Sequence, residues 1–311
     1  MSAGDDHAAL VLAQVTALTR GGAKSLATRG RADLRVREEA EDWLKKGLDS
    51  YHRRRFGDAL ACFERGIQLN PNHSELQLRL GIMYHEGEGV PKDHAKAFVW
   101  FRRAAEQGDA GAQNNLGYAY HQGEGVPQDF AQAAAWFRKA SERGLRDAQH
   151  SLGVIYAAGD GVAQDYEQAA MWYRKAADQE HAEAQFNVGT CYFYGQGVPQ
   201  DGVMAAYYWR KGGEQGHMES QYTLGNLYLH GWGVQQDYEQ AAVWYRRAAE
   251  QGEPFAQSEL GDLYSKGLGV PQDLAQAAIW YREAAQQGHS DAQQKLGLLD
   301  VSRRGEPLSR S

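Results

Sequence analysis

The stretch that decides the fold runs from residue 110 to residue 145 and reads AGAQNNLGYAYHQGEGVPQDFAQAAAWFRKASERGL. The same pattern returns when the chain is shifted by 36 residues in either direction, without an insertion or a deletion. The Leu-Gly pair in this stretch, Leu116-Gly117, has counterparts in step with it along the chain: Leu80-Gly81, Leu152-Gly153, Val188-Gly189, Leu224-Gly225, Leu260-Gly261 and Leu296-Gly297. A fixed period of this length predicts a stacked array of repeats.

Each repeat predicts two helices joined by a glycine-rich loop. Gln113, Leu116 and Tyr120 stand at i, i+3 and i+7, which places them on one face of a first helix. Gly123 follows where a left-handed helix cap needs glycine, and the loop GEGVP comes next. Asp129 then precedes a second helix, whose free backbone amides its carboxylate can cap.

The second helix carries Ala133, Trp136, Phe137 and Ala140 on one face. Alanine allows two helices to approach closely, and we expect the aromatic pair to fill the space between neighbouring repeats. A single repeat would leave these rings exposed to water. Stacking buries them, so we expect the array to be held together by contacts between neighbours.

The recurring pattern LGxxYxxGxGVPQDxxxAxxWxRxAAxxG resembles the Sel-1-like repeat, a relative of the tetratricopeptide repeat, over residues 74–299. The resemblance implies an all-α fold, a right-handed α-solenoid or superhelix of antiparallel helix-turn-helix repeats. It also implies a protein that acts as an adaptor, scaffold or regulator, with first helices that line a concave surface. The departures from the pattern are local: Ala163 and Gln235 replace the loop proline, Glu180 replaces a glycine, and Tyr208-Trp209 reverses the usual aromatic order.

The repeats set the predicted domain organisation. We expect a weakly ordered N-terminal arm over 1–36, a hairpin over 37–73, six repeats of 36 residues over 74–289, and a partial capping helix and tail over 290–311. The hairpin resembles a tetratricopeptide repeat through the spacing of six residues: Trp43, Gly47, Ala59, Phe63, Gly66 and Pro71.

Composition narrows the class of partner. The chain has 33 Lys and Arg against 40 Asp and Glu, and this acidic balance argues against binding to a nucleic-acid backbone. No run of 18 apolar residues occurs, so we expect no membrane insertion. Cys62 and Cys191 form no disulfide framework, and we expect both to be small buried hydrophobic residues in a cytoplasmic protein, with export left open.

The histidines are the first candidates for chemistry. His85 and His121 lie one period apart, on helices whose axes would be ~8–10 Å apart, without an obvious third ligand. His181, His217 and His289 lie at repeat junctions, where we expect each to bond a terminal carbonyl. The sequence therefore predicts no metal site, no cofactor and no catalytic residue.

A column of glutamines recurs once per repeat: Gln77, Gln113, Gln149, Gln185, Gln221, Gln257 and Gln293. We expect these amides to bond neighbouring backbone groups or tyrosine hydroxyls, because buried polar groups need partners. The glutamine column and the glycine, tyrosine, tryptophan and alanine columns are therefore interpreted as scaffold.

Function is expected where the repeat varies, on the first helices. The predicted partner-binding residues are mostly aromatic: Phe186, Phe193, Tyr194, Tyr222, His230, Trp232, Tyr118 and His121. Aromatic residues of this kind dominate binding hot spots, and a groove of this kind suits a peptide or a helix. We predict a non-catalytic adaptor or scaffold that binds a protein or peptide segment on the concave face.

Two alternatives remain. Some cysteine-rich bacterial relatives imply a weak hydrolase of β-lactams or cell-wall fragments, but this chain lacks their cysteine framework, and we expect no turnover of nitrocefin. The other alternative is a structural spacer whose partners bind the convex side or the ends, for which Arg53-Arg54-Arg55 is a candidate surface.

Overall fold

The computed structural model describes residues 34–304 of the chain, with side chains as far as residue 299. Helices joined by short loops account for the fold, and no β-strand occurs between residues 34 and 304. The predicted N-terminal arm, 1–36, lies outside the described residues except for 34–36, which are helical. The last part of the predicted tail, 305–311, also lies outside them.

The chain divides into two compact units, residues 1–129 and 130–311. In the first unit, helical residues 34–52 are followed by α2 (Phe56–Leu69), α3 (Ser74–Glu86), α4 (His94–Glu106) and α5 (Ala110–Gln122). From α2 onward, each helix packs against the next one in the chain. Phe63, Leu76 and Met83 are among the buried side chains that form the core here.

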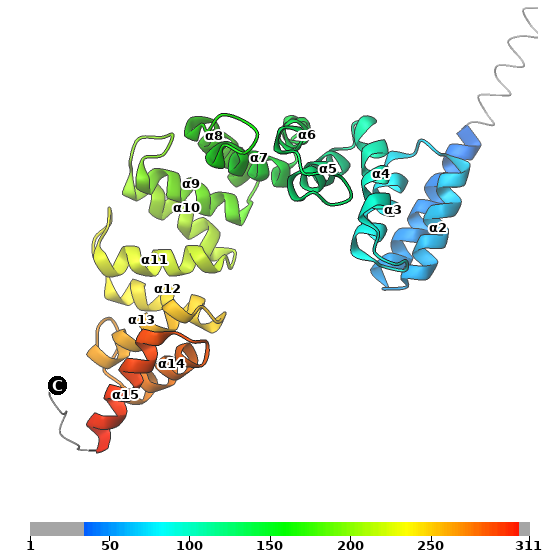
Figure 1. The fold of residues 1–311 in the computed structure, drawn as a ribbon. Helices are drawn as coiled ribbons and strands as arrows, with labels where there is room; N and C mark the ends of the chain where they lie inside the picture. The colour runs from blue at the N-terminus through cyan, green and yellow to red at the C-terminus, as the bar shows by residue number, and fades with distance from the viewer. Residues whose placement is uncertain (1–33, 305–311) are drawn as a thin grey trace, which may run out of the picture. The chain divides into compact units, whose positions relative to one another are not determined.

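The second unit is a longer run of helix pairs that stack in chain order, as Figure 1 shows for α9 to α14. Its first four helices are α6 (Phe130–Glu142), α7 (Arg146–Ala158), α8 (Tyr166–Ala177) and α9 (Ala182–Tyr194). The next three are α10 (Gly202–Glu214), α11 (Met218–His230) and α12 (Tyr238–Glu250). The last three are α13 (Pro254–Lys266), α14 (Leu274–Gln286) and α15 (Ser290–Arg304).

Capping residues set the helix ends. Five second helices begin after an aspartate whose carboxylate accepts a hydrogen bond from a backbone amide: Asp93, Asp165, Asp201, Asp237 and Asp273. Gly123 ends α5 in the left-handed conformation, with φ of 75°, as its position in the repeat predicts. Caps of this type satisfy backbone groups that the helix itself leaves unpaired.

The junction histidines cap the N-termini of helices by accepting from backbone amides, whereas they were predicted to bond backbone carbonyls. The Nδ1 atoms of His181, His217 and His289 accept hydrogen bonds from the backbone amides of Ala184, Ser220 and Ala292, respectively. Each histidine precedes a helix, and the free backbone groups at that end are donors. The expectation that these side chains bond terminal carbonyls was therefore wrong.

The glutamine column forms a ladder along the array. Gln221 donates from Nε2 to the carbonyl of Gly213 at 2.8 Å, and its Oε1 accepts from Gln251 at 2.6 Å. The bond to the backbone confirms the first predicted partner, but the second is a glutamine rather than a tyrosine. Tyrosine hydroxyls instead accept from an arginine of the preceding repeat, as Tyr264 does from Arg246.

The two rings of the aromatic pair have different places. Tyr245 of α12 lies in a notch at Gly225 of α11, within its own repeat, where an added Cβ would be 2.4 Å from the ring. Trp244 packs against Gly213 of the preceding repeat. Only the tryptophan therefore lies between repeats in this pair, and the expectation that both rings do so was wrong. Trp209 occupies the equivalent notch at Gly189, which is where the reversed order Tyr208-Trp209 places it.

The notch gives a prediction with a built-in control. Replacing Gly225 with alanine should lower the free energy of unfolding by about 1–3 kcal/mol, because the new methyl group overpacks a closed site. Gly297 holds the same position in the repeat, but an added Cβ there meets no atom of the described residues within 4 Å. Gly297→Ala should therefore raise stability by up to about 1 kcal/mol through helix propensity. Urea unfolding of both variants tests this, and equal effects would contradict it.

The two cysteines are free. Cys191 is buried, as expected, and burial raises the pKa of its thiol to about 11. Cys62 is only half-buried, so the expectation of a fully buried residue was wrong there. Burial raises the pKa of the Cys62 thiol as well.

Candidate functional site

A pocket of about 280 Å³ opens on the second unit beside the first helices α9 and α11. Eight residues line it: Phe186, Thr190, Phe193, Tyr194, Trp209, Thr223, Asn226 and Trp232. Helix α9 supplies four of them, α10 supplies Trp209, α11 supplies two, and the loop after α11 supplies Trp232. None of the eight carries a charge, so the pocket is suited to an uncharged group.

Helical spacing and one loop position build this pocket. Phe186, Thr190 and Phe193 stand at i, i+4 and i+7 on α9, so they share a face. Trp232 precedes Gly233, whose backbone lies so close to Gly202 that an added Cβ would be 2.5 Å from the Gly202 Cα. This close approach holds the Trp232 loop against the preceding repeat.

Aromatic rings form a continuous wall around the pocket. The Phe193 ring lies 5.3 Å from Trp209, 6.0 Å from Trp232 and 5.0 Å from Tyr194, measured between centroids. Trp209 is buried and donates from Nε1 to the carbonyl of Phe186, whereas Tyr194 and Trp232 remain 65% and 49% exposed. The site thus has a buried aromatic base and two exposed rings available to a partner.

The structure brings together only some of the residues predicted to bind a partner. Phe186, Phe193, Tyr194 and Trp232 line the pocket, and His230 stacks on Trp232 at 4.4 Å. Tyr222 does not line this pocket. Its ring lies 6.0 Å from Tyr245 and 6.2 Å from Phe255. Tyr118 and His121 belong to the first unit, where Tyr118 lines a different pocket.

The sequence analysis expected function in the variable columns that contain Thr190, Thr223 and Asn226 but did not single these residues out, and it missed Trp209 as a pocket residue. Thr190 could have been found, because it lies one helical turn after Phe186 on the same face. Trp209 was assigned to the scaffold because an aromatic residue recurs at its position in every repeat. Its ring nevertheless lines the pocket, as Phe101 does at the equivalent place in the first unit.

A second pocket, of about 180 Å³, lies in the first unit at the equivalent place in the repeat. His85, Phe101 and Glu124 line it, three periods before Phe193, Trp209 and Trp232. In the structure His85 contacts His94 and Glu124, two residues that the sequence analysis did not connect with it. Repeat periodicity aligns only equivalent positions, and it therefore does not reveal contacts between different columns.

With this geometry established, six consecutive segments match the Sel1 repeat: 74–109, 110–145, 146–181, 182–217, 219–253 and 254–289. The chain belongs to the Sel1 repeat family. Proteins of this family are generally protein-interaction scaffolds and typically non-catalytic. No curated protein matches the chain. No described helix is long and apolar enough to cross a bilayer.

Two solved structures are similar over most of the chain. One is a protective antigen of uropathogenic Escherichia coli that displays an SLR fold, at 36% identity and a TM-score of 0.80, covering 89% of this chain. The chain spans 59% of that antigen's length. The other is a Sel1 repeat protein from Oxalobacter formigenes, at 32% identity and a TM-score of 0.71, covering 85% of this chain and 76% of that one. The predicted fold class, an all-α solenoid of antiparallel helix pairs, is confirmed.

Proposed function

We propose that this chain is a non-catalytic adaptor that binds a protein or peptide segment on the face formed by the first helices, the concave face of the solenoid. The aromatic pocket between α9 and α11 is the observation that carries the proposal. It collects exposed tyrosine and tryptophan at one place, and these residue types dominate the binding energy of protein interfaces.

The size of the pocket favours a side-chain anchor over a small-molecule substrate. At about 280 Å³ the pocket lies at the lower end of the ~300–1,000 Å³ that small-molecule sites usually measure, and it has room for a single large side chain. Its lining is aromatic, with two threonines and an asparagine as the polar groups. The partner therefore presents an apolar or aromatic side chain, flanked by polar groups that can bond to Thr223 or Asn226.

A second exposed ring extends the surface by one repeat. Phe255 at the start of α13 is more than half exposed and lies beside Tyr222 of α11. Helices α11 and α13 are in contact, so their axes are ~8–10 Å apart. Tyr222 and Phe255 therefore offer a partner further aromatic contacts one repeat beyond the pocket.

Replacing Trp232 or Tyr194 with alanine tests the proposal. Each substitution should weaken partner binding by about 30-fold or more, the effect of losing a hot-spot side chain, while the melting temperature changes little because both rings are exposed. Affinity capture from a lysate, quantified by mass spectrometry, identifies the partners that depend on these rings. Calorimetry with one such partner then measures the loss.

Tyr207→Ala is the matched control. Tyr207 is a 48% exposed tyrosine of the second helix α10, outside the pocket lining. This variant should retain every partner. If Trp232→Ala and Tyr194→Ala also retained every partner while remaining folded, the pocket would not be the binding site.

A further inference from the structure

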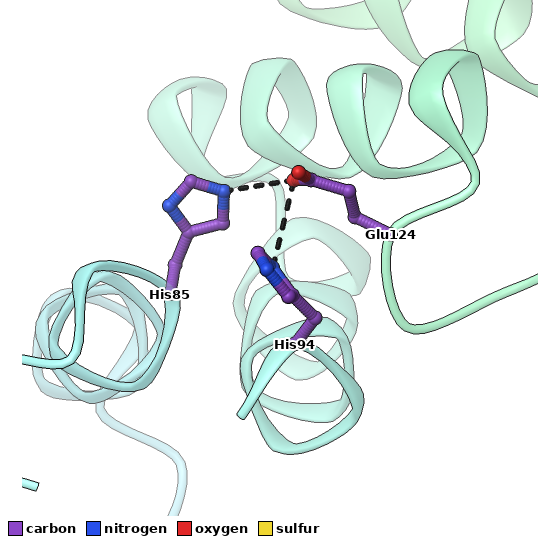
Figure 2. Close-up of side chains that lie close together, drawn as sticks. All are labelled: His85, His94 and Glu124. Atoms are coloured by element: carbon purple, nitrogen blue, oxygen red, sulfur yellow. Dashed lines mark hydrogen bonds and ion pairs between the residues drawn. The ribbon is translucent and has the colours of Figure 1, made fainter. Parts of the chain in front are cut away.

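Three metal-ligating side chains meet in the first unit, as Figure 2 shows. His85 Nε2 lies 2.9 Å from Glu124 Oε2, and His94 Nδ1 lies 3.6 Å from the same oxygen. One ligand atom from each residue lies within 4.8 Å of the other two. The three side chains come from three different segments: α3, the start of α4, and the loop after α5.

The backbone fixes this meeting. Gly125, with φ of 71°, lies so close to the His94 backbone that an added Cβ would be 2.2 Å from its carbonyl oxygen. Glu124 therefore extends from a loop that is held against the first residue of α4. Trp232 occupies the same loop position in a later repeat and lies at the aromatic pocket. The same loop geometry therefore places a carboxylate in one repeat and an indole ring in another.

His85 is oriented for ligation. Its Nδ1 bonds Glu86 Oε1 at 2.9 Å, which leaves Nε2 directed at Glu124. A carboxylate on the far nitrogen is the usual partner of a metal-binding histidine, because it fixes the ring and raises the basicity of the ligating nitrogen. The His85 ring also lies edge to face with His94, at 5.1 Å between centroids.

His94 supplies an independent indication. Its Nδ1 atom is buried and makes no hydrogen bond to any described residue, since 3.6 Å to Glu124 is too long for one. Buried side-chain nitrogens nearly always have a partner, and one without a partner requires an explanation. A cation bound between His94, His85 and Glu124 provides that partner.

The geometry points to a divalent transition-metal site of the zinc class, with His85 Nε2, His94 Nδ1 and a Glu124 carboxylate oxygen as ligands. Two imidazoles and one carboxylate suit Zn²⁺ and its neighbours, whereas Ca²⁺ and Mg²⁺ prefer oxygen ligands. Ligands about 2.0–2.2 Å from a zinc ion lie ~3–3.5 Å apart, so the cluster needs only a small inward movement. The metal would join two consecutive repeats.

The other histidine cluster lacks these features. In the group of His150, His181 and Glu183, the Asn187 amide bonds His150 Nε2 at 2.9 Å. His181 Nδ1 accepts the amide of Ala184 as a helix cap. None of its buried ring nitrogens is without a partner among the described residues, so this cluster lacks the indication that His94 supplies and serves as the internal control.

Titration calorimetry of the untagged full chain with Zn²⁺, after chelator treatment, tests the site. We expect saturation at one equivalent, no competition from millimolar Ca²⁺, and a higher melting temperature with Zn²⁺. Co²⁺ should replace Zn²⁺ and give the visible absorption of a nitrogen-ligated, four-coordinate ion. Absence of saturable one-to-one binding would overturn the proposal.

Variants separate this site from adventitious binding. His85→Ala, His94→Ala and Glu124→Gln should each weaken Zn²⁺ binding by 100-fold or more, whereas His150→Gln should leave it unchanged. Glu124→Gln keeps the size of a partly exposed loop residue, so it tests ligation even if a histidine variant fails to fold. Equal binding by Glu124→Gln and the unaltered chain, or a loss of binding in His150→Gln, would contradict this assignment.

Discussion

Replacing Tyr245 with alanine is expected to lower the free energy of unfolding by about 3–5 kcal/mol. The side chain is 0% exposed, and its ring fills the notch at Gly225. Its hydroxyl donates to Asn226 Oδ1 at 2.8 Å, so the substitution also leaves a polar group without its partner. Removing the ring would leave a cavity between α11 and α12. These two helices also pack against α10 and α13, which limits how far they can close the cavity.

Two variants show where the loss originates. Tyr245→Phe removes only the hydroxyl and should cost about 1 kcal/mol. Tyr207→Ala removes an exposed ring and should change stability by about 0.5 kcal/mol or less. Urea unfolding followed by circular dichroism measures all three. A similar loss for Tyr207→Ala and Tyr245→Ala would mean that packing in the notch does not hold the repeat together.

The second large effect is a loss of stability in acid that depends on His150. Burial lowers the pKa of His150 from 6.5 to about 4, and the charge on His181 adds to the shift, against opposing effects of Glu183 and Asp147. The ring is only 16% exposed and stacks on His181 at 4.7 Å. The neutral ring accepts the Asn187 amide at Nε2, and a proton there would oppose that bond.

The direction follows from the lowered pKa. Between about pH 6.5 and pH 4 the unfolded chain binds a proton at His150 that the folded chain does not, so protons favour unfolding. The stabilisation is complete above about pH 6.5 and is lost as the pH falls toward 4. The full change in pKa from 6.5 to about 4 corresponds to roughly 3.4 kcal/mol, most of which is lost by pH 4.

His150→Gln isolates this contribution from those of the other acid-sensitive groups. The substitution keeps an acceptor for Asn187 but removes the titration. Unfolding free energies measured from pH 7 to pH 4 should therefore fall more steeply for the unaltered chain than for the variant, by about 2–3 kcal/mol over the range. Parallel pH profiles for the two proteins would contradict the prediction.

Much of the fold follows from the repeat alone. The helix face of Leu116 and Tyr120, the left-handed glycine at 123 and the capping aspartates each depend on local backbone chemistry, which a sequence records directly. The same local reasoning placed Phe186 and Phe193 on one face of α9. Trp232 was predicted in the same partner-binding group, but its contact with Phe193 depends on how closely a loop approaches the preceding repeat.

The errors have a common physical cause. The sequence analysis offered tyrosine as an alternative partner of the glutamines and did not connect His85 with Glu124, because a period of 36 residues aligns equivalent positions and leaves contacts between different columns open. Such contacts depend on helix packing distances that differ by a few ångströms. Hydrogen bonds and ligation are sensitive to those differences, whereas burial of a ring is not.

The sequence by itself determined the class of this protein. A strict period, recurrent small and aromatic residues, and helix-capping residues together specify a stacked array of helix pairs. Only the tertiary structure decided what each junction presents. One loop, held by the close approach of a glycine to the preceding helix, carries Glu124 over two histidines in one place and Trp232 over Phe193 in another. The reason is that local backbone preferences act between residues close in the chain, whereas a site requires side chains from several segments to converge in space.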